Sequence, residues 1–402
     1  MSIASFFHVM IKPRGPICNL DCSYCYYLSK EHLYPESDFR MTDKVLEKFT
    51  REYIQSQNVP EVIFGWQGGE PLLMGLDFFE RAMRYQQEYA RDRVRILNTI
   101  QTNGVLLDDD WCRFLRDNGF LVGISVDGPE HVHDAYRTDK GGKATFKDVM
   151  AGVDLLKKHN VEFNVLTTVH SANVGSPLDV YRFVRDEIGS AFVQFIPIVQ
   201  LDNETGYQEG NRVTDRSVGG REYGEFLKTI FNEWVNRDVG KMFVQMFDVS
   251  LAAWTGQGAV LCIFAETCGA AMALEHNGDL YSCDHYVEPR NLLGNVMETS
   301  LAELAGKTEQ QVFGRSKAAT LPRHCRECEV RFVCNGGCPK NRILDTPDGE
   351  PGLNCLCEGY RSFFNHIDKG MRYMAGALGI GQPPAGIMES FAAEAYGDKA
   401  PD

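Results

Sequence analysis

Six short apolar runs, separated by helical patterns, set the architecture of residues 1 to about 240. The runs that predict strands are 6–12, 61–66, 95–101, 121–126, 162–169 and 192–197. Helical periodicity follows Thr42, a candidate N-cap, and recurs over residues 76–91, 108–118, 146–159 and 177–188. Strands that alternate with helices pair in parallel through right-handed crossovers. The sequence therefore predicts a parallel α/β sheet, either open or curled into a partial barrel.

Three cysteines follow the first predicted strand, at the end of the strand where active sites of such sheets lie. Cys18, Cys22 and Cys25 have the spacing C-x3-C-x2-C, and Tyr24 stands directly before the third. Thiolates favour soft metals and hold iron–sulfur clusters. Three ligands on a four-iron cluster leave one iron open for chemistry. The alternative is buried thiols or a zinc site, but structural zinc takes four ligands and no fourth Cys or His stands at a usual spacing.

Polar and glycine-rich segments follow the next strands. Gln67-Gly68-Gly69-Glu70-Pro71 comes after the second, Thr-Asn-Gly at 102–104 after the third, and Ser-Val-Asp-Gly at 125–128 at the end of the fourth. Two adjacent glycines let the backbone approach a ligand closely. Each segment is also consistent with an ordinary turn.

Thirteen cysteines are divided between the two ends of the chain, and only Cys112 lies between residues 26 and 261. Cys112 falls on an apolar helical pattern and is best explained as a core residue. The C-terminal part also contains a predicted β-hairpin, with strands 272–275 and 280–282 around an Asn-Gly turn. The remaining C-terminal cysteines are Cys262, Cys268, Cys283, Cys325, Cys328, Cys334, Cys338, Cys355 and Cys357. A zinc ribbon built on the four at 325–338 is the alternative, and it leaves the others unexplained.

The net charge and the absence of long apolar runs limit the classes of binding partner and the cellular location. The net charge is −14 at pH 7, which argues against nucleic acid as the main partner. The N-terminus, MSIASFFH, lacks the pattern of a signal peptide, and no apolar run reaches about 18 residues. We expect a cytoplasmic monomer that contacts no membrane, with reduced thiols rather than disulfides.

The predicted domain organisation has three parts. Residues 1–240 form the α/β part, residues 241–370 form the cysteine-rich part with bridging helices, and residues 371–402 form a poorly ordered tail. Helical patterns over 221–237 and 241–254 bridge the first two parts. Residues 202–220 are polar and glycine-rich and predict a linker or a mobile loop.

The three-cysteine loop with its tyrosine resembles the signature of the radical S-adenosylmethionine (SAM) enzymes. In that superfamily the open iron chelates the amino and carboxylate groups of SAM, and the reduced cluster cleaves SAM to a 5′-deoxyadenosyl radical. The resemblance implies a partial (β/α)6 radical SAM barrel. It assigns SAM binding to Tyr24, Gly68, Gly69, Glu70, Ser125 and Arg137. A planar guanidinium suits a carboxylate, although a lone Arg such as Arg137 is more often a solvated surface residue.

The C-terminal cysteine pattern closely resembles the SPASM domain, an auxiliary-cluster extension of radical SAM enzymes that act on peptides. Eight thiolates suffice for two [4Fe–4S] clusters, which gives three clusters in all. In bacterial ferredoxins the cysteine before proline ligates the other cluster, and Cys338 precedes Pro339. The resemblance assigns Cys262, Cys268, Cys283 and Cys338 to one cluster, and Cys325, Cys328, Cys334 and Cys357 to the other. Cys355 is the alternative to Cys357, which is favoured because Gly-Leu-Asn-Cys-Leu-Cys at 352–357 resembles the family's GLNYLC segment.

Residues 5–370 as a whole resemble anaerobic sulfatase-maturating enzymes, through the cysteine blocks, WQGGEP at 66–71 and MGLDFF at 74–79. These oxidoreductases convert a Cys or Ser in a sulfatase motif of the type Cys/Ser-x-Pro/Ala-x-Arg to Cα-formylglycine (3-oxoalanine). The resemblance implies hydrogen abstraction by the 5′-deoxyadenosyl radical and electron transfer to an auxiliary cluster. It also implies proton transfer to Asp284. The alternative is that Asp284, an acid directly after a predicted strand, is a turn residue. A flavodoxin- or ferredoxin-like protein would supply electrons.

Two other functions remain open. One is a different SPASM-type radical SAM enzyme, which forms thioether or carbon–carbon crosslinks on a ribosomal peptide. The other is an electron carrier or structural metal protein, against which the six-strand scaffold and the open cysteine triad argue. The sequence does not distinguish a Cys-type from a Ser-type substrate, and does not identify the sulfatase.

Overall fold

Six parallel strands form the centre of the molecule in the computed structural model, which describes residues 6–259 and 261–390. Each pairs in parallel with the next along the chain. The predicted parallel α/β sheet is confirmed, because all six predicted strands are present with ends that differ by at most two residues. They are β1 (His8–Lys12), β2 (Glu61–Trp66), β3 (Arg95–Thr102), β4 (Leu121–Ser125), β5 (Phe163–Val169) and β6 (Phe192–Pro197).

Amphipathic helices cover this sheet, as the 3.6-residue periodicity predicts. In α1, for example, Leu46, Phe49 and Tyr53 are fully buried, and the Phe49 and Tyr53 rings stack with centroids 5.2 Å apart. The Thr42 hydroxyl caps this helix by accepting a hydrogen bond from the Val45 amide at 3.4 Å. The covering helices are α1 (Asp43–Ser56), α2 (Leu76–Glu88), α3 (Asp109–Asp117), α5 (Phe146–Lys158) and α6 (Pro177–Arg182), which continues as a π-helix over Phe183–Ile188.

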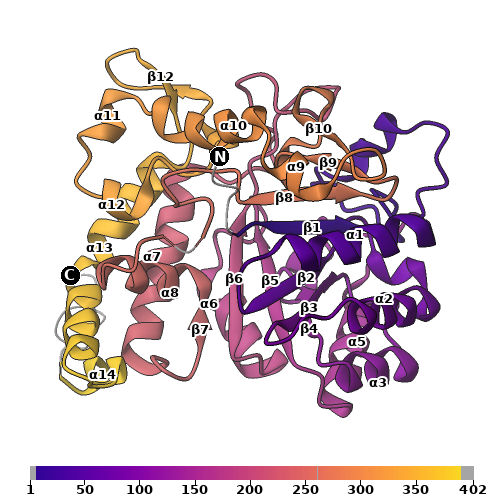
Figure 1. Cartoon of the computed structure of the whole chain (residues 1–402). Helices are drawn as coiled ribbons and strands as arrows, with labels where there is room; N and C mark the ends of the chain where they lie inside the picture. The colour runs from indigo at the N-terminus through magenta and orange to yellow at the C-terminus, as the bar shows by residue number, and fades with distance from the viewer. Residues whose placement is uncertain (1–5, 260, 391–402) are drawn as a thin grey trace.

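The C-terminal hairpin extends the same sheet. Strand β8 (Ala271–Glu275) pairs in parallel with β1, and β9 (Asp279–Tyr281) and β10 (Leu292–Asn295) follow it in antiparallel order. The short strand β7 (Phe243–Val244) lies at the other edge, so the ten-stranded sheet stays open. The predicted hairpin and the partial barrel are confirmed, whereas the pairing of β8 with β1 was not predicted. Figure 1 shows the orange hairpin beside the indigo strand β1.

Three helices of the C-terminal half pack together beside β6 (Figure 1): α7 (Gly220–Arg237), α8 (Gln245–Trp254) and α13 (Cys357–Gly379). Helix α13 lies against α7 so closely that a Cβ on Gly359 would be 1.9 Å from the Gly220 carbonyl oxygen. Only glycine permits this approach. The bridging helices at 221–237 and 241–254 are thereby confirmed, the second starting four residues later than predicted.

The prediction that residues 371–402 form a poorly ordered tail is wrong for 371–379 and 387–390, which are helical. Helix α13 continues to Gly379 because Ile367, Met371 and Met374 are buried on one side of it, and a further turn, α14 (Ile387–Ser390), follows. Residues 391–402 lie outside the described residues. None of the described helices combines the length and apolar character needed to cross a bilayer.

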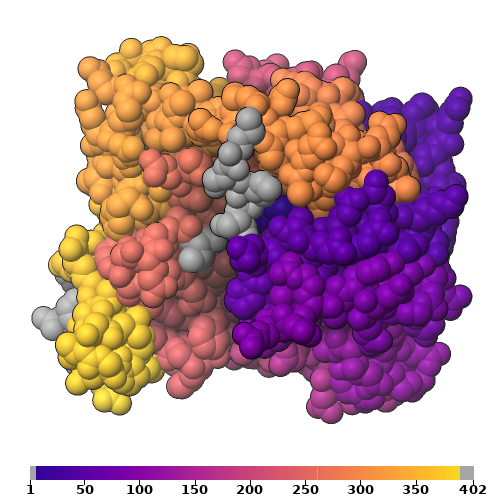
Figure 2. Space-filling model, viewed as in Figure 1, coloured from indigo at the N-terminus to yellow at the C-terminus, as the bar shows by residue number. Residues whose placement is uncertain are grey.

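The loop at 202–217 is docked rather than a linker between separate units. The Lys30 ammonium donates to the Gly206 carbonyl at 2.9 Å, and the Gln208 amide donates to Glu288 Oε1 at 2.7 Å. One hydrophobic core runs from β1 to α14, across the predicted boundary at residue 240. Figure 2 shows the orange C-terminal residues lying along the upper side of the indigo and purple N-terminal half. The cysteine-rich part therefore packs directly on the barrel.

Candidate active site

The three N-terminal cysteines lie in the loop between β1 and the short 3-10 helix Leu28–Leu33. Burial is the largest cause that raises the pKa of the Cys18 thiol, to about 12. The charges of the neighbouring Cys22 and Cys25 thiols raise it as well. Burial likewise raises the pKa of Cys22 to about 11. Thiols so placed keep their protons at neutral pH until a metal replaces them. Three neighbouring thiols, with no fourth cysteine in this loop as the structure describes it, fit a cluster with one iron left free.

The two glycines after β2 hold this loop in place. The Gly69 amide donates to the Gly15 carbonyl at 2.8 Å, and a Cβ on Gly69 would lie 2.1 Å from the Ile17 carbonyl oxygen. Gly68 has a φ of +128°, which L side chains rarely adopt. The close approach that two glycines allow is therefore made to the cysteine loop itself.

Glu70 is fully buried beside these glycines. Its carboxylate accepts hydrogen bonds from the Leu72 amide at 3.0 Å, the Thr102 hydroxyl at 2.9 Å and the Asn103 amide at 2.9 Å. Burial, opposed by these hydrogen bonds, raises its pKa to about 7. Glu70 joins the ends of β2 and β3, and the Asn103 side chain in turn donates to Cys18 Sγ at 3.6 Å.

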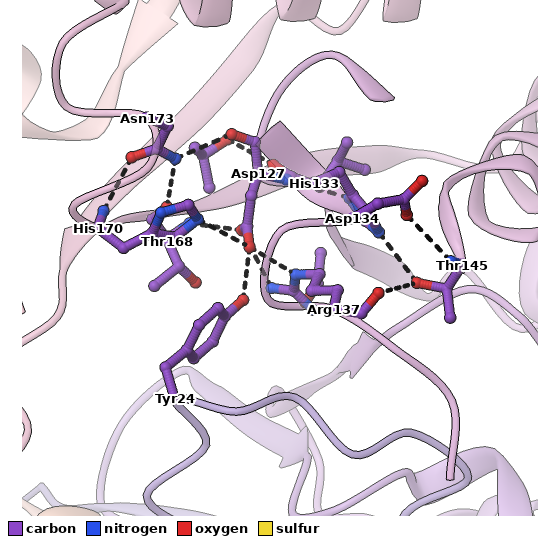
Figure 3. Close-up of polar contacts among 12 residues, drawn as sticks. Tyr24, Asp127, His133, Asp134, Arg137, Thr145, Thr168, His170 and Asn173 are labelled. Atoms are coloured by element: carbon purple, nitrogen blue, oxygen red, sulfur yellow. Dashed lines mark hydrogen bonds and ion pairs between the residues drawn. The ribbon is translucent and has the colours of Figure 1, made fainter. Parts of the chain in front are cut away.

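A second buried carboxylate, Asp127, gathers two of the predicted SAM-binding side chains (Figure 3). Arg137 donates to both of its oxygens, at 2.8 and 3.2 Å, and the Tyr24 hydroxyl donates to Oδ2 at 2.6 Å. The Thr168 amide donates to Oδ1 at 3.0 Å, and His170 Nε2 lies 3.6 Å from Oδ2. Burial opposes ionisation, but the Arg137 charge and the hydrogen bonds from His170 and Arg137 together outweigh it and hold the pKa of Asp127 far below its usual range.

Arg137 is therefore a buried residue, and the alternative of a solvated surface Arg is wrong. Its segment is also tied to the cysteine loop through the backbone, because the Asp21 amide donates to the Thr138 carbonyl at 2.8 Å. Ser125, at the end of β4, accepts a hydrogen bond from the Gln101 side chain at 2.9 Å. The sequence pattern indicated Asp127 only as part of a possible turn. Its position at the carboxyl end of a strand, where binding sites of parallel sheets lie, could have indicated a functional residue.

Asp284 is buried, with 7% of its surface exposed, at the start of the 3-10 helix Asp284–Tyr286. Its carboxylate pairs with the Lys12 ammonium and accepts a hydrogen bond from the Tyr26 hydroxyl. Burial raises its pKa, but the charges of Lys12 and His285 and these hydrogen bonds outweigh burial, so the pKa is lowered and the carboxylate is ionised. The turn alternative does not account for such burial. Lys12 and Tyr26, which hold Asp284, were not predicted.

The C-terminal thiols separate into two groups. In one group, burial raises the pKa values of Cys262, Cys268 and Cys283, and the charge of Cys338 raises them further. In the other, Cys325, Cys328, Cys334 and Cys357 line a common pocket. This grouping is the one that the family resemblance implies, and it separates Cys338 from the other three members of the alternative zinc ribbon. Among the described residues, no three Cys, His, Asp or Glu side chains have the arrangement for a single metal ion.

Cys355 lies outside the pocket of the second group, and its charged neighbour is Lys340. We therefore expect Cys357→Ser to lose one cluster, and with it about four of about twelve iron atoms per chain. Cys355→Ser, the matched control two residues away, should keep its full iron content. Iron analysis of both proteins after anaerobic reconstitution tests this, and the opposite pattern would make Cys355 the ligand.

The comparisons with known proteins agree with this geometry. The model of the radical SAM superfamily matches residues 13–184, and the SPASM model, described as an iron–sulfur cluster-binding domain, matches residues 262–329. The serine-type anaerobic sulfatase-maturating enzyme of Bacteroides thetaiotaomicron is 48% identical over 95% of this chain and 94% of that protein. The chain belongs to the anaerobic sulfatase-maturating enzymes.

A second relative and a solved structure support this family membership. The cysteine-type anaerobic sulfatase-maturating enzyme of Clostridium perfringens is 33% identical over 89% of this chain and 95% of that protein. A solved structure, native anSMEcpe with bound AdoMet and the Cp18Cys peptide, has a TM-score of 0.82 and 31% identity over 92% of this chain and 99% of that chain. The expected radical SAM fold with a C-terminal SPASM domain is confirmed.

Proposed function

We propose that this protein oxidises a Cys or Ser of a sulfatase polypeptide to Cα-formylglycine, with SAM and three [4Fe–4S] clusters as cofactors. Its family membership supports this, since relatives of both the serine and the cysteine type are anaerobic sulfatase-maturating enzymes. A solved relative holds both AdoMet and a peptide. When bound, SAM and the cluster of Cys18, Cys22 and Cys25 supply a hydrogen-abstracting radical, and the cluster beside Asp284 takes up an electron.

The observation that carries the proposal is the buried, ionised carboxylate of Asp284 between two thiol groups. It directly follows Cys283, and its hydrogen-bond partner Tyr26 directly follows Cys25. A substrate residue at this point must lose the proton of its thiol or hydroxyl when its Cβ is oxidised. Asp284 can accept that proton, while Lys12 and Tyr26 hold the carboxylate in one orientation.

The SAM side of the site is built on the Asp127 cluster. Tyr24 and Arg137 are held by the same carboxylate, which fixes both side chains beside the cysteine loop. Arg137 would offer its remaining donors to the SAM carboxylate. Glu70, Ser125 and the backbone at 68–69 complete the proposed SAM-binding set.

Asp127→Asn is expected to weaken SAM binding by about 10–100-fold, the range typical of groups that orient ligand-binding side chains. The amide loses the ion pair with Arg137, and its NH2 group cannot accept the hydrogen bonds that the second carboxylate oxygen accepts. The SAM-dependent change in the spectrum of the N-terminal cluster, titrated against SAM, measures the affinity. Asp134→Asn is the matched control, because Asp134 accepts only from the Thr145 and Phe146 amides of the same network. Unaltered affinity in Asp127→Asn would remove Asp127 from the SAM site.

The partners proposed are a sulfatase polypeptide with a Cys/Ser-x-Pro/Ala-x-Arg motif and a flavodoxin- or ferredoxin-like electron donor. The enzyme would act as a monomer in the cytoplasm, on a chain not yet folded around its active site, without nucleic acid or membrane.

The direct test uses the protein reconstituted anaerobically with iron and sulfide, then supplied with reductant, SAM and a Cys-x-Pro-x-Arg peptide. Formylglycine replaces the thiol sulfur by an aldehyde oxygen, which mass spectrometry and hydrazide trapping both detect. A peptide that loses two hydrogens and gives no aldehyde would identify a crosslinking enzyme instead. SAM that stays uncleaved would identify an electron carrier.

A further inference from the structure

Lys317 is a buried lysine for which the sequence pattern indicated no role. It lies on α10 (Thr308–Ala319), which Figure 1 shows above the hairpin strand β8, and its side chain has 0% of its surface exposed. Its ammonium donates to the carbonyl oxygens of Cys262 at 2.8 Å and Ile263 at 2.9 Å. Lys317 is therefore fixed on the backbone of one proposed cluster ligand.

No carboxylate balances this charge among the residues that the structure describes. Lys317 forms no ion pair with an Asp or Glu there, and the charged groups that act on it are the Cys262, Cys268 and Cys338 thiols and Arg342. A buried ammonium without a counter-charge is costly. Three of the four groups that surround it belong to one thiol group, so the charge that compensates Lys317 is that of the thiolates when they hold a cluster.

We propose that Lys317 raises the reduction potential of the cluster held by Cys262, Cys268, Cys283 and Cys338, and so makes that cluster the electron acceptor of the reaction. This inference rests on the proposed function. A cluster gains one negative charge on reduction, and a fixed cation in a buried site stabilises the reduced state. In the substrate oxidation, one hydrogen atom would pass from Cβ to the 5′-deoxyadenosyl radical, one proton to Asp284 and one electron to this cluster. A Ser substrate would then give the aldehyde directly, whereas a Cys substrate would give a thioaldehyde that water hydrolyses with release of hydrogen sulfide.

Among the described residues, no lysine lines the pocket of the second thiol group. The cations at this pocket are Arg331 and Arg361. Arg361 is half-exposed and donates to both oxygens of Glu329, at 2.8 and 3.1 Å, and Arg331 is partly exposed and donates to the Arg326 carbonyl at 3.4 Å. Arg342 lies near members of both groups and does not distinguish them. Lys340, whose ammonium donates to the Val199 carbonyl at 3.2 Å, is a further cation near Cys338 and Cys283. Of the two thiol groups, the one next to Asp284 therefore has the fully buried ammonium, whereas the two arginines at the pocket of the other reach solvent.

The test is a redox titration of the reconstituted enzyme, followed by electron paramagnetic resonance, for Lys317→Met and Lys317→Gln. Both variants remove the charge, but Gln keeps an N–H donor for the carbonyl oxygens. We expect each to lower the equilibrium constant for reduction of this cluster about tenfold, which is a shift of about 59 mV for one electron. Lys317→Arg, which keeps the charge, should restore the potential. Lys147→Met, at a side chain that is 86% exposed, should leave it unchanged.

Three further readouts separate the outcomes. Unshifted midpoint potentials in both neutral variants, or iron lost equally from Met, Gln and Arg variants, would overturn the proposal and leave Lys317 a structural residue. Slower formylglycine formation at an unchanged initial rate of 5′-deoxyadenosine formation would support it. A wild-type protein that makes no formylglycine, but whose cluster potential still falls in the neutral variants, would refute the proposed function and leave the effect of Lys317 on the potential standing.

Discussion

Asp284→Asn is expected to stop formylglycine formation while SAM cleavage continues. The substitution keeps the shape of the side chain, but an amide cannot take the substrate proton. Loss of a general base lowers a rate by about 10²–10⁴-fold. The proposed SAM-binding residues Tyr24 and Arg137 contact Asp127 rather than Asp284, so the initial rate of 5′-deoxyadenosine formation should change little. Both products are measured in the same reaction by liquid chromatography and mass spectrometry.

The Asp284 variant also leaves the buried Lys12 ammonium without its partner, which costs about 3–5 kcal/mol of stability. Iron content and thermal unfolding must therefore be measured beside the rates. Tyr26→Phe is the matched control, because it removes one hydrogen bond from the same carboxylate and leaves the proton acceptor in place. Its loss of formylglycine formation should be much smaller. Equal turnover in wild type and Asp284→Asn would exclude Asp284 as the base.

Cys22→Ala is expected to abolish SAM cleavage altogether, along with about four of the iron atoms. Two thiolates cannot hold a cluster that has only three protein ligands, and the two C-terminal thiol groups are unaffected. Cys112→Ala is the matched control, since Cys112 is buried on α3 in the hydrophobic core and belongs to none of the three thiol groups. That variant should lose some stability and keep both iron and activity. Persistent 5′-deoxyadenosine formation in Cys22→Ala would place the reactive cluster elsewhere.

The parts of the fold that sequence reasoning recovered are those that depend on local pattern. The six strands and their helices follow from periodicity and capping, whereas the division of the C-terminal thiols was implied by the family resemblance, with which the proline after Cys338 agrees. Pairing of β8 with β1 joins residues about 263 positions apart, and no local signal encodes it. The end of the chain was predicted to be poorly ordered because it is rich in Gly, Pro and Ala, although Ile367, Met371 and Met374 recur at helical spacing.

The same limit applies to the site. The proposed cluster ligands and the glycines stand in short motifs, so they could be proposed from residue type and spacing. Asp127 and Lys12 act through contacts with Tyr24 and Asp284, each more than 100 residues away in the chain. A buried carboxylate or ammonium is recognised by its partners, and these become visible only when the strand ends meet in three dimensions.

The most direct test of the account uses a Cys-x-Pro-x-Arg peptide with deuterium on the cysteine Cβ, incubated anaerobically with reduced enzyme and SAM. We predict that deuterium appears in 5′-deoxyadenosine, in proportion to the formylglycine that the peptide gains. Formation of 5′-deoxyadenosine without deuterium, or a deuterium transfer that yields a crosslinked peptide and no aldehyde, would contradict it.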